Sequence, residues 1–293
     1  MKDFYESLTI TIVLYEESFS LISKCLEKIR KFKIIIIDNA GNLELKNKIQ
    51  KEYKIFKYLL NDKNLGFSKA INQGIKISDT KFILNLEADC IINEENIYKL
   101  YEAINSYQDC FITIPTMFNE DNELTQSGGI LMEKNLGYDV LKFDGDTCVD
   151  FPTTAAILFR RQEMLDIGLF DEDLFIYFPD SEIGRRIKKN KRSVIQIFNS
   201  KALHKMGILK IKNNFKNVFY RNYYFTIDGL IYYFKENLHS LYLEKLKKKI
   251  PNLILKLILN VFLLRFSKSI ECFSKILAYH NFKKKYLKKK YNS

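Results

Sequence analysis

Short apolar segments alternate with amphipathic segments through the first 115 residues of the chain. The apolar segments are rich in β-branched residues and predict strands, whereas apolar residues at helical spacing predict helices between them. We expect strands at residues 8–14, 33–37, 55–60, 81–86 and 110–115, and helices at 18–31, 43–53, 66–77 and 94–107. Strands that are apolar almost throughout and separated by helices are typical of a parallel sheet covered on both faces. The sequence therefore predicts an α/β fold with a Rossmann-like, mainly parallel central sheet.

The pattern loosens beyond residue 115 but continues to about residue 207. Residues 116–150 have Asn, Asp and Gly scattered through them. The further expected elements are a strand at 155–160, helices at 161–167 and 180–190, and a last strand at 193–198 that ends before His204. We expect the main body of the protein to occupy residues 1–207 and a region of different character to follow at 208–293.

The region at 208–293 stands out by its charge. It contains 19 Lys or Arg and 4 Asp or Glu, whereas residues 1–207 contain 28 basic and 31 acidic residues. Residues 214–235 are rich in Tyr and Phe, and residues 251–279 predict a helix that begins at Pro251, where a missing N–H costs little. A segregated basic tail with an apolar helix face favours binding to an anionic surface.

Cysteine usage and hydropathy indicate the compartment. The five cysteines are scattered and form no C-x-x-C pair, which is typical of a reducing compartment without disulfides. The N-terminal segment Met1–Ser7 is polar and charged, so we expect no secretory signal peptide. No stretch of about 20 uncharged apolar residues occurs, so we expect no transmembrane helix.

Three acidic residues follow the ends of predicted strands. Asp38 comes after the second strand, and Glu87 and Asp89 come directly after the fourth. Ligands of parallel α/β sheets bind at the carboxyl ends of the strands. Two carboxylates two residues apart suit Mg²⁺ or Mn²⁺, which prefer oxygen ligands and often complete their shell with phosphate oxygens. The pattern predicts a metal and phosphate site, although acidic pairs also occur in ordinary solvated loops.

The segment Asn64–Gly74 reads Asn-Leu-Gly-Phe-Ser-Lys-Ala-Ile-Asn-Gln-Gly. Gly66 permits a tight turn into the expected helix, and the N-terminus of a helix can face an anion. We expect this junction and the acidic segment 87–89 to lie at neighbouring strand ends. A plain loop-to-helix junction is the alternative interpretation.

A third cluster lies at the start of the helix expected at 180–190. Asp180 follows Pro179 there, and two arginines at 185 and 186 come one to two turns later. Asp180 can act as a general base or only as a helix N-cap. Either arginine can pair with a carboxylate or a phosphate. His204 is a further candidate, although a lone histidine is more often structural than functional.

Six features occur in a fixed order between residues 8 and 207. They are Asp38 after the second strand, N-x-G-F-x-x-A-x-N-x-G at 64–74, the acidic pair at 87–89, G-x-F-D-E at 168–172, an acid-plus-Arg helix at 180–186, and H-x-x-G at 204–207. In this order they resemble family 2 glycosyltransferases with the GT-A fold, in particular the rhamnosyltransferase-like branch. None of the motifs is decisive alone, but six in this order are specific.

The resemblance implies a role for each matched position. Asp89 is implied as the metal-binding acid that reaches the diphosphate, with Glu87 at the other acidic position. His204 is implied near the metal or the diphosphate, and Asp180 is implied as the general base. The residues implied in binding the nucleotide sugar are Tyr15, Glu16, Asp38, Asn64, Gly66, Lys69, Glu87, Arg185 and Arg186. The implied cofactor is a divalent cation, Mg²⁺ or Mn²⁺.

Two positions depart from the family pattern. Glu87 stands where the first acid is usually Asp or Asn, so the resemblance does not imply that Glu87 contacts the metal directly. Pro179 precedes the implied base where Glu is usual, which concerns the surroundings of Asp180 rather than its identity.

The resemblance also implies how the chain is divided. A GT-A catalytic domain at 1–207 would have a nucleotide-binding half at about 1–115 and an acceptor-binding half at 116–207. The helical, basic and aromatic-rich region at 208–293 lies outside the resemblance. Its composition predicts association with a membrane, and the alternative is that residues 214–279 pack on the catalytic domain or form a dimer interface.

The expected activity is inverting transfer of a hexosyl or deoxyhexosyl group from a nucleoside-diphosphate sugar, with a UDP- or dTDP-linked donor. The expected acceptor is a carbohydrate or lipid-linked glycan in the assembly of bacterial surface polysaccharide, lipooligosaccharide or glycoprotein glycan. The expected location is cytoplasmic, peripheral on the inner face of the cytoplasmic membrane, where an anionic membrane surface is the partner of the tail.

Two other function classes fit part of the sequence. A nucleotidyltransferase needs a Gly-rich, basic loop after its first strand, and residues 15–20 contain neither Gly nor a basic residue. A nucleic-acid-binding protein would use the basic tail but would leave the acidic strand ends unexplained. Nucleic acid is therefore not an expected partner.

Overall fold

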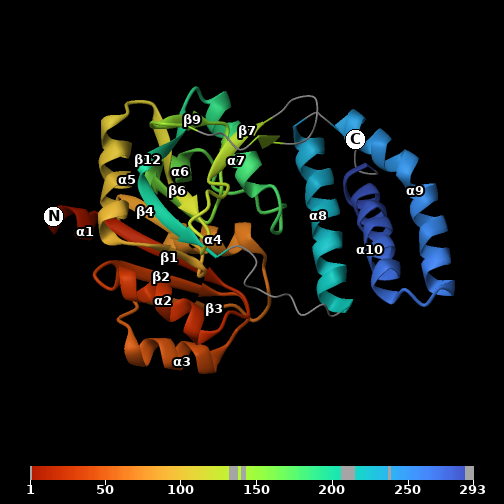
Figure 1. The fold of residues 1–293 in the computed structure, drawn as a ribbon, viewed down its shortest axis with the longest axis horizontal. Helices are drawn as coiled ribbons and strands as arrows, with labels where there is room; N and C mark the ends of the chain where they lie inside the picture. The colour runs from red at the N-terminus through yellow and green to blue at the C-terminus, as the bar shows by residue number, and fades with distance from the viewer. Residues whose placement is uncertain (1, 132–137, 140–142, 206–214, 237–238, 288–293) are drawn as a thin grey trace. The chain divides into compact units, whose positions relative to one another are not determined.

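The structure is a computed structural model, shown in Figure 1, that describes residues 2–131, 138–139, 143–205, 215–236 and 239–287. The chain divides into two compact units. Unit 1 comprises Met1–Asp171 and Pro179–Ile208, and unit 2 comprises Glu172–Phe178 and Leu209–Ser293. The short segment Glu172–Phe178 therefore groups with the C-terminal tail, although it lies within the main body in the sequence.

Unit 1 is built on a curled nine-stranded sheet. Eight of its strands lie in the order β3-β2-β1-β4-β11-β6-β12-β5, and the ninth, β9, pairs with β12. The strands are β1 (Leu8–Leu14), β2 (Lys33–Asp38), β3 (Lys57–Leu60), β4 (Phe82–Leu86), β5 (Cys90–Ile92), β6 (Cys110–Phe118), β9 (Thr147–Val149), β11 (Ala156–Arg160) and β12 (Ser193–His204). A small second sheet has the order β10-β7-β8, with β10 at Phe151–Pro152, β7 at Gly128–Leu131 and β8 at Tyr138–Asp139.

The large sheet is mixed, with a parallel part that contains the first four strands. β1 pairs in parallel with β2 and β4, β2 pairs in parallel with β3, and β6 pairs in parallel with β12. β11 runs antiparallel between β4 and β6, and β5 and β9 run antiparallel to β12. The predicted α/β class is confirmed, and the predicted parallel arrangement holds from β3 through β2 and β1 to β4, whereas the rest of the sheet is mixed.

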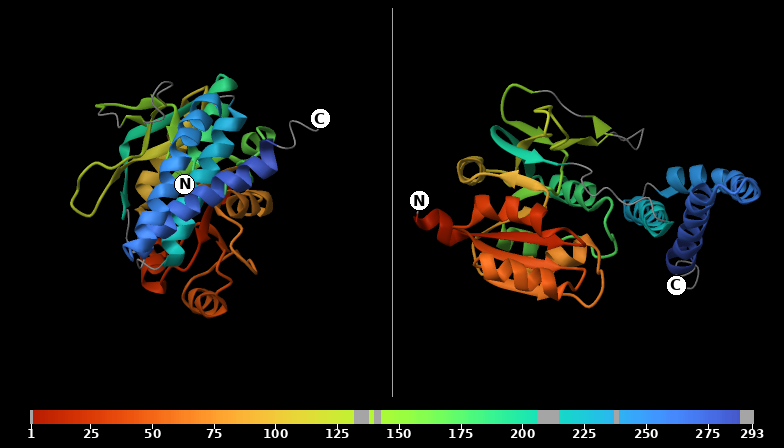
Figure 2. Two further views of the ribbon diagram at one scale, coloured as in Figure 1. Left: turned by 90° about the vertical axis from the view of Figure 1, so that its right-hand side faces the viewer. Right: turned by 60° about the horizontal axis from the view of Figure 1, so that its bottom comes forward.

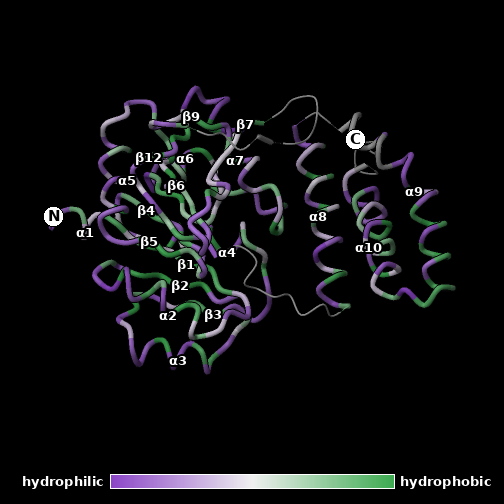
Figure 3. Tube along the Cα trace, in the orientation of Figure 1, coloured by the Kyte–Doolittle hydropathy of each residue, from purple (hydrophilic) through white to green (hydrophobic). Residues whose placement is uncertain are grey.

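Helices cover both faces of this sheet, as Figures 1 and 2 show. They are α1 (Lys2–Ser7), α2 (Phe19–Ile29), α3 (Leu43–Glu52), α4 (Phe67–Ile77), α5 (Glu94–Ser106), α6 (Arg161–Asp166) and α7 (Pro179–Lys189). One core cluster joins α2, α3 and α5 to the sheet, and a second joins α4, α6 and α7 to its other face. The strands carry the hydrophobic colour of Figure 3, because both of their faces are buried.

The close packing of α4 depends on Gly74. A Cβ at this position would lie 2.8 Å from Ile37 Cδ1 and 3.1 Å from Thr11 Cγ2, so a larger residue would push the helix away from β1 and β2. The second glycine of the 64–74 motif therefore has a packing role.

Two sequence-based expectations for unit 1 are wrong. The last strand does not end at residue 198, since β12 continues through a register irregularity between Ile197 and Lys201 and ends at His204. The strand ends beside segments 64–74 and 87–89 are not neighbours either, because β3 lies at the sheet edge and is separated from β4 by β2 and β1. Strand order is a long-range property that adjacency in sequence does not determine.

Unit 2 contains three long helices, α8 (Phe215–Lys235), α9 (His239–Phe262) and α10 (Phe266–Phe282), followed by a short π-helix at Lys283–Leu287. Its core consists of Leu174, Leu230, Ile231, Tyr232, Tyr233 and Phe282. The expectation of one helix at 251–279 is wrong. Pro251 lies inside α9, and the helical conformation is interrupted at Leu264, whose φ is 53°.

Among the helices that the structure describes, none has an apolar stretch long enough to cross a membrane.

Candidate active site

The acidic segment Glu87–Asp89 forms a tight turn between β4 and β5. Glu87 N–H donates to Ala155 O at 2.9 Å, and Cys90 N–H donates to Glu87 O at 3.0 Å. Ala88 between them is 4% exposed, so the turn buries its middle residue and presents a carboxylate on either side.

His204 reaches this turn through strand pairing. β12 and β5 pair antiparallel with His204 opposite Cys90, and Lys205 N–H donates to Asp89 O at 3.1 Å. The extension of β12 beyond residue 198 is therefore what brings the histidine beside the acidic turn.

The side chains of Glu87, Asp89 and His204 form a cluster of metal-ligand type. His204 Nε2 lies 3.6 Å from Glu87 Oε2 and 3.6 Å from Asp89 Oδ1. The three ligand atoms all lie within 4.8 Å of one another. A divalent cation accepts two carboxylate oxygens and one imidazole nitrogen, so these residues can hold such an ion.

The cluster perturbs the imidazole strongly. Burial alone lowers the pKa of His204, but hydrogen bonds to Asp89 and Glu87 and their negative charges outweigh it and raise the pKa to about 9. His204 Nδ1 has no hydrogen-bond partner among the described residues. A cation at the cluster would replace the proton as the positive partner of the two carboxylates.

Glu87 is also fixed from the side of β11. Thr154 Oγ1 donates to Glu87 Oε1 at 3.2 Å, which leaves Oε2 directed to His204. Sequence reasoning left open whether Glu87 belongs to the metal site, and the structure places its carboxylate in the cluster.

Asp180 is the second residue of α7. Its Oδ1 accepts the N–H of Ser181 at 2.7 Å. Burial raises the pKa of Asp180 to about 6, against the hydrogen bonds of the helix N-terminus, and the charge of Glu87 adds to the increase. A carboxylate with such a pKa is suited to accept a proton near neutral pH.

The end of β2 places Asp38 in a closed hydrogen-bond arrangement. Its side chain is 1% exposed, with Oδ1 accepting Ala40 N–H at 2.8 Å and Oδ2 accepting the Tyr58 hydroxyl at 3.0 Å. Burial and the charge of Asp38 raise the pKa of Tyr58 far above its usual value.

Tyr15 and Glu16 lie at the end of β1 and are exposed, and Glu16 has a φ of 65°. The next residue, Glu17, was not predicted. Its carboxylate accepts Tyr15 N–H, and burial raises the pKa of Glu17 to about 7, helped by the charges of Asp89 and Asp38. The run Glu16-Glu17 was the available signal, but sequence alone did not show which carboxylate turns inward.

Residues of the 64–74 motif are used to build the loop. Asn64 Oδ1 accepts Gly66 N–H at 2.9 Å, and Gly66 O accepts Asn39 Nδ2–H at 3.1 Å. Gly66 has a φ of 84° and is the N-cap residue of α4, while Lys69 is exposed on the first turn of this helix.

Asn72 connects this motif to the G-x-F-D-E motif. Its Nδ2 donates to Phe170 O at 2.9 Å, and its Oδ1 accepts Phe170 N–H at 3.1 Å. Both residues are 1% exposed, so two motifs that are far apart in sequence are joined by a buried pair of hydrogen bonds.

Arg186 is held within its own part of the fold. It pairs with Glu182, with 2.5 Å between Nε and Oε1, and donates to the backbone oxygens of Ile167 and Leu169. These contacts fix the turn before residue 170. Arg185, its neighbour, is half-buried on α7.

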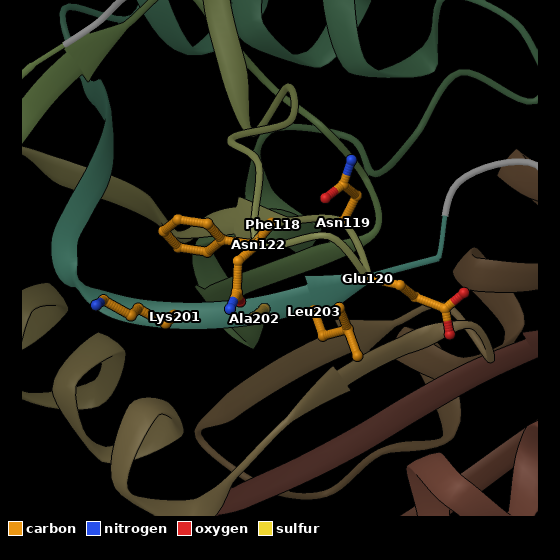
Figure 4. A pocket seen from close by; sticks show the side chains of 7 residues that line it. All are labelled: Phe118, Asn119, Glu120, Asn122, Lys201, Ala202 and Leu203. Atoms are coloured by element: carbon orange, nitrogen blue, oxygen red, sulfur yellow. The ribbon is translucent and has the colours of Figure 1, made fainter.

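A cavity of about 400 Å³ lies between the turn after β6 and strand β12 (Figure 4). It is lined by Phe118, Asn119, Glu120, Asn122, Lys201, Ala202 and Leu203. None of the residues predicted for the site lines it.

A sequence model described as "Glycosyl transferase family 2" matches residues 9–165, which is more than half of the chain. The chain belongs to glycosyl transferase family 2. This matched range includes the acidic turn and the 64–74 motif, and it confirms the family to which the sequence features pointed. No protein in the curated set matches the chain significantly.

Solved structures of glycosyltransferases share the fold at low identity. GalNAc-T7, solved with UDP, GalNAc and Mn²⁺, aligns with a TM-score of 0.59 and 17% identity over 84% of this chain and 57% of its own. The mannosyltransferase PcManGT from Pyrobaculum calidifontis, solved with GDP-Man and Mn²⁺, aligns with a TM-score of 0.54 and 10% identity over 94% and 86%. S. aureus TarS aligns with a TM-score of 0.50 and 14% identity over 74% and 39%. The chain thus spans 57% of the length of GalNAc-T7 and 39% of the length of TarS.

Proposed function

We propose that this family 2 glycosyltransferase moves a hexosyl or deoxyhexosyl group, with inversion, from a nucleoside-diphosphate sugar to a hydroxyl of a glycan or lipid-linked glycan. The observation that carries the proposal is the cluster of Glu87, Asp89 and His204 at the carboxyl end of β4, in a chain of this family. The rhamnosyltransferase-like branch remains part of the proposal, as does assembly of a bacterial surface polysaccharide, lipooligosaccharide or glycoprotein glycan.

Glu87, Asp89 and His204 would hold Mg²⁺ or Mn²⁺, and two solved structures with the same fold contain Mn²⁺. When bound, the cation supplies positive charge that neutralises the departing nucleoside diphosphate. The three protein ligands leave room for phosphate oxygens in the coordination shell.

Asp180 would act as the general base. The acceptor oxygen forms a bond to the anomeric carbon while the bond from that carbon to the diphosphate oxygen breaks. The hydroxyl proton passes to the carboxylate of Asp180, and the bonding electrons leave with the diphosphate. Direct displacement of this kind inverts the anomeric centre, and holding both substrates in one site supplies much of the acceleration.

The donor nucleotide would bind over the ends of β1 and β2. Tyr15, Glu16 and Asp38 belong to these strand ends, and Glu17 joins them through its inward carboxylate. The 64–74 junction with Asn64, Gly66 and Lys69, and the arginines of α7, complete the proposed set. A UDP- or dTDP-linked donor is proposed.

Thermal stabilisation tests the donor proposal directly, because a bound ligand raises the melting temperature. UDP-, dTDP- and GDP-sugars are screened with and without Mn²⁺, using wild type and Asp89→Asn. We expect one nucleotide class to stabilise wild type only with Mn²⁺ and to have little effect on the variant. If none of the nucleotide sugars raised the melting temperature, the proposal would be contradicted.

Helix α9 and the turn after it support a second proposal, peripheral attachment to the inner face of the cytoplasmic membrane. Phe262 is 82% exposed, Leu264 72% and Leu255 64%, and the C-terminal half of α9 carries the hydrophobic colour of Figure 3. Further exposed apolar side chains are Ile254, Ile258, Leu259, Val261, Leu263 and Phe266. Residues 247–268 contain six Lys or Arg and no Asp or Glu.

The occupant that fits this surface is an anionic lipid bilayer. Apolar side chains bury into the interface, and each basic residue contributes about 1 kcal/mol near anionic lipid. A second copy of the chain would bring the same positive charge to the surface and be repelled by it, which disfavours the dimer. The basic residues are equally unsuited to a cationic or neutral partner.

Flotation with phosphatidylglycerol-containing vesicles tests the membrane proposal. Wild type is compared with Phe262→Asp/Leu264→Asp and with Leu43→Asp, which alters an exposed apolar residue of α3 in unit 1, 57% exposed. We expect wild type and Leu43→Asp to float and the double variant to stay in solution. Equal flotation of all three proteins would contradict the proposal, and loss of a wild-type dimer in the double variant would assign the surface to self-association.

A further inference from the structure

Unit 2 includes a short segment far from the tail in sequence, Glu172–Phe178, which we call the strap. The carboxylate of Asp228 in α8 holds the middle of the strap. Its Oδ2 accepts the N–H groups of Ile176 at 2.9 Å and Tyr177 at 3.0 Å. Asp228 is 1% exposed, so these two backbone donors find their partner inside the unit rather than in water.

An aspartate in this place needs an explanation. Asp is a poor residue for the interior of a helix, and a buried carboxylate is unfavourable unless it is hydrogen-bonded. Burial raises the pKa of Asp228 to about 6, while the strap N–H groups act in the opposite direction. The packing of α8 alone would be served better by an apolar side chain. The carboxylate is matched to the two N–H groups of the strap instead.

Aromatic stacking and ion pairs fix the strap on both sides of this anchor. The rings of Phe175 and Tyr224 stack with centroids 3.8 Å apart and planes at 11°. Phe178 stacks on Tyr232 with centroids 5.4 Å apart. Near the start of the strap, Asp173 pairs with Lys235 at 2.8 Å and with Lys285 at 3.2 Å. The strap is therefore held along its length by the helices of unit 2.

The strap ends one peptide bond before α7. Phe178 has a φ of 69°, a conformation that a bulky residue adopts only when its surroundings hold it there. Pro179 follows with its fixed φ and starts α7, and Asp180 is the next residue. Two N–H anchors, a left-handed residue and a proline thus precede Asp180 without an intervening flexible residue.

We propose that Asp228 is a positioning residue for sugar transfer, whose carboxylate fixes the backbone of the strap directly before Pro179 and thereby restrains the backbone conformation at Asp180, the next residue. The proposal rests on the proposed function of Asp180 as the base. It gives the tail a role in the reaction that is independent of any membrane.

The test uses the full-length chain with Asp228→Ala, Asp228→Asn and the control Asp173→Asn, which removes two ion pairs at the start of the same strap. Transfer kinetics and nucleotide affinity in the presence of Mn²⁺ are measured for each. We expect Asp228→Ala to lower kcat at least tenfold while nucleotide affinity changes less than twofold. Asp228→Asn keeps a carbonyl oxygen that can accept both N–H groups and should restore most of kcat. Asp173→Asn should remain within threefold of wild type.

Two results would overturn the proposal. One is wild-type kcat in folded Asp228→Ala, and the other is a parallel loss of nucleotide affinity and kcat, which would indicate a general structural role. Amide hydrogen exchange of residues 173–181 tests the anchor without any substrate, and we expect faster exchange in Asp228→Ala than in Asp173→Asn. Unchanged exchange would refute the anchor, whereas absence of transfer by wild type with every donor would refute only the proposed function.

Discussion

His204 Nε2 lies 3.6 Å from Asp89 Oδ1 because β12 extends far enough to pair with β5 directly beside the acidic turn. This contact joins the last strand of the sheet to the carboxyl end of β4. It turns a pair of acidic residues into a three-sided cluster with both oxygen and nitrogen ligands.

Loss of one ligand from this cluster should weaken metal binding. We expect Asp89→Asn and His204→Ala each to reduce the affinity for Mn²⁺ by at least ~10-fold, measured by titration calorimetry with the nucleoside diphosphate present. Asp79→Asn is the matched control, because Asp79 pairs with Lys33 and has no part in the cluster. Wild-type affinity in both cluster variants would rule out this metal site.

Glu87→Gln separates the contribution of the residue that departs from the family pattern. Its Oε2 lies 3.6 Å from His204 Nε2, so we expect a loss of Mn²⁺ affinity of about 10-fold, comparable with that of Asp89→Asn. An affinity within twofold of wild type would show that Glu87 only borders the site.

Transfer should lose activity in acid. The pKa of Asp180 is raised to about 6, and below that pH the protonated carboxyl can no longer accept a proton. We therefore expect kcat/KM for the acceptor to level off above about pH 7 and to fall about tenfold per unit below pH 6. Glu17→Gln is the control, because the pKa of Glu17 is raised to about 7. If the fall in kcat/KM at acid pH disappears in Glu17→Gln, the titrating group is Glu17 and not Asp180.

Gly184→Ala should disturb α7 itself. The added Cβ would lie 2.9 Å from Phe151 Cα and closer still to the backbone oxygen of Asp150, so α7 must move away from β10. We expect a loss of stability of about 3 kcal/mol and a lower kcat, since α7 carries Asp180. Gly145→Ala meets nothing within 4 Å and should leave both quantities unchanged in urea unfolding and in kinetics. Equal stability of the two variants would contradict the packing argument.

Asn72→Ala should destabilise unit 1 by leaving Phe170 N–H and O without partners in a buried place. Loss of two buried hydrogen bonds corresponds to about 2–3 kcal/mol. The comparison is Asn105→Ala on the exposed face of α5, where one bond to Tyr101 O is lost and less than about 1 kcal/mol is expected. Similar denaturation midpoints for the two variants would argue against a joining role for Asn72.

The local parts of this fold follow well from sequence, because strands such as Leu8–Leu14 and helices such as Phe67–Ile77 carry clear periodic patterns. Long-range pairing does not follow from such patterns. His204 could not be placed in β12, and β3 could not be placed at the sheet edge, since both depend on distant partners. The proline at 251 was misread because a start signal and an interior proline look alike.

The site shows the same limit. Asp89 and Asp180 were singled out from their places at a strand end and a helix start, which are local signals, and the resemblance to the family implied their roles. Glu17 was not singled out, because its contact with Tyr15 N–H and the influence of Asp89 and Asp38 on its pKa appear only in the folded chain. The role proposed for Asp228 was equally hidden, since a lone Asp within an aromatic helix gives no sign of the strap that it binds.

The most direct test of the central claim is the transfer rate of Asp180→Asn with saturating donor and Mn²⁺. If Asp180 is the base of a glycosyltransferase, kcat should fall by ~10²–10⁴-fold while the affinities for the nucleotide and for Mn²⁺ stay within twofold of wild type. A variant that turns over at the wild-type rate would contradict the account.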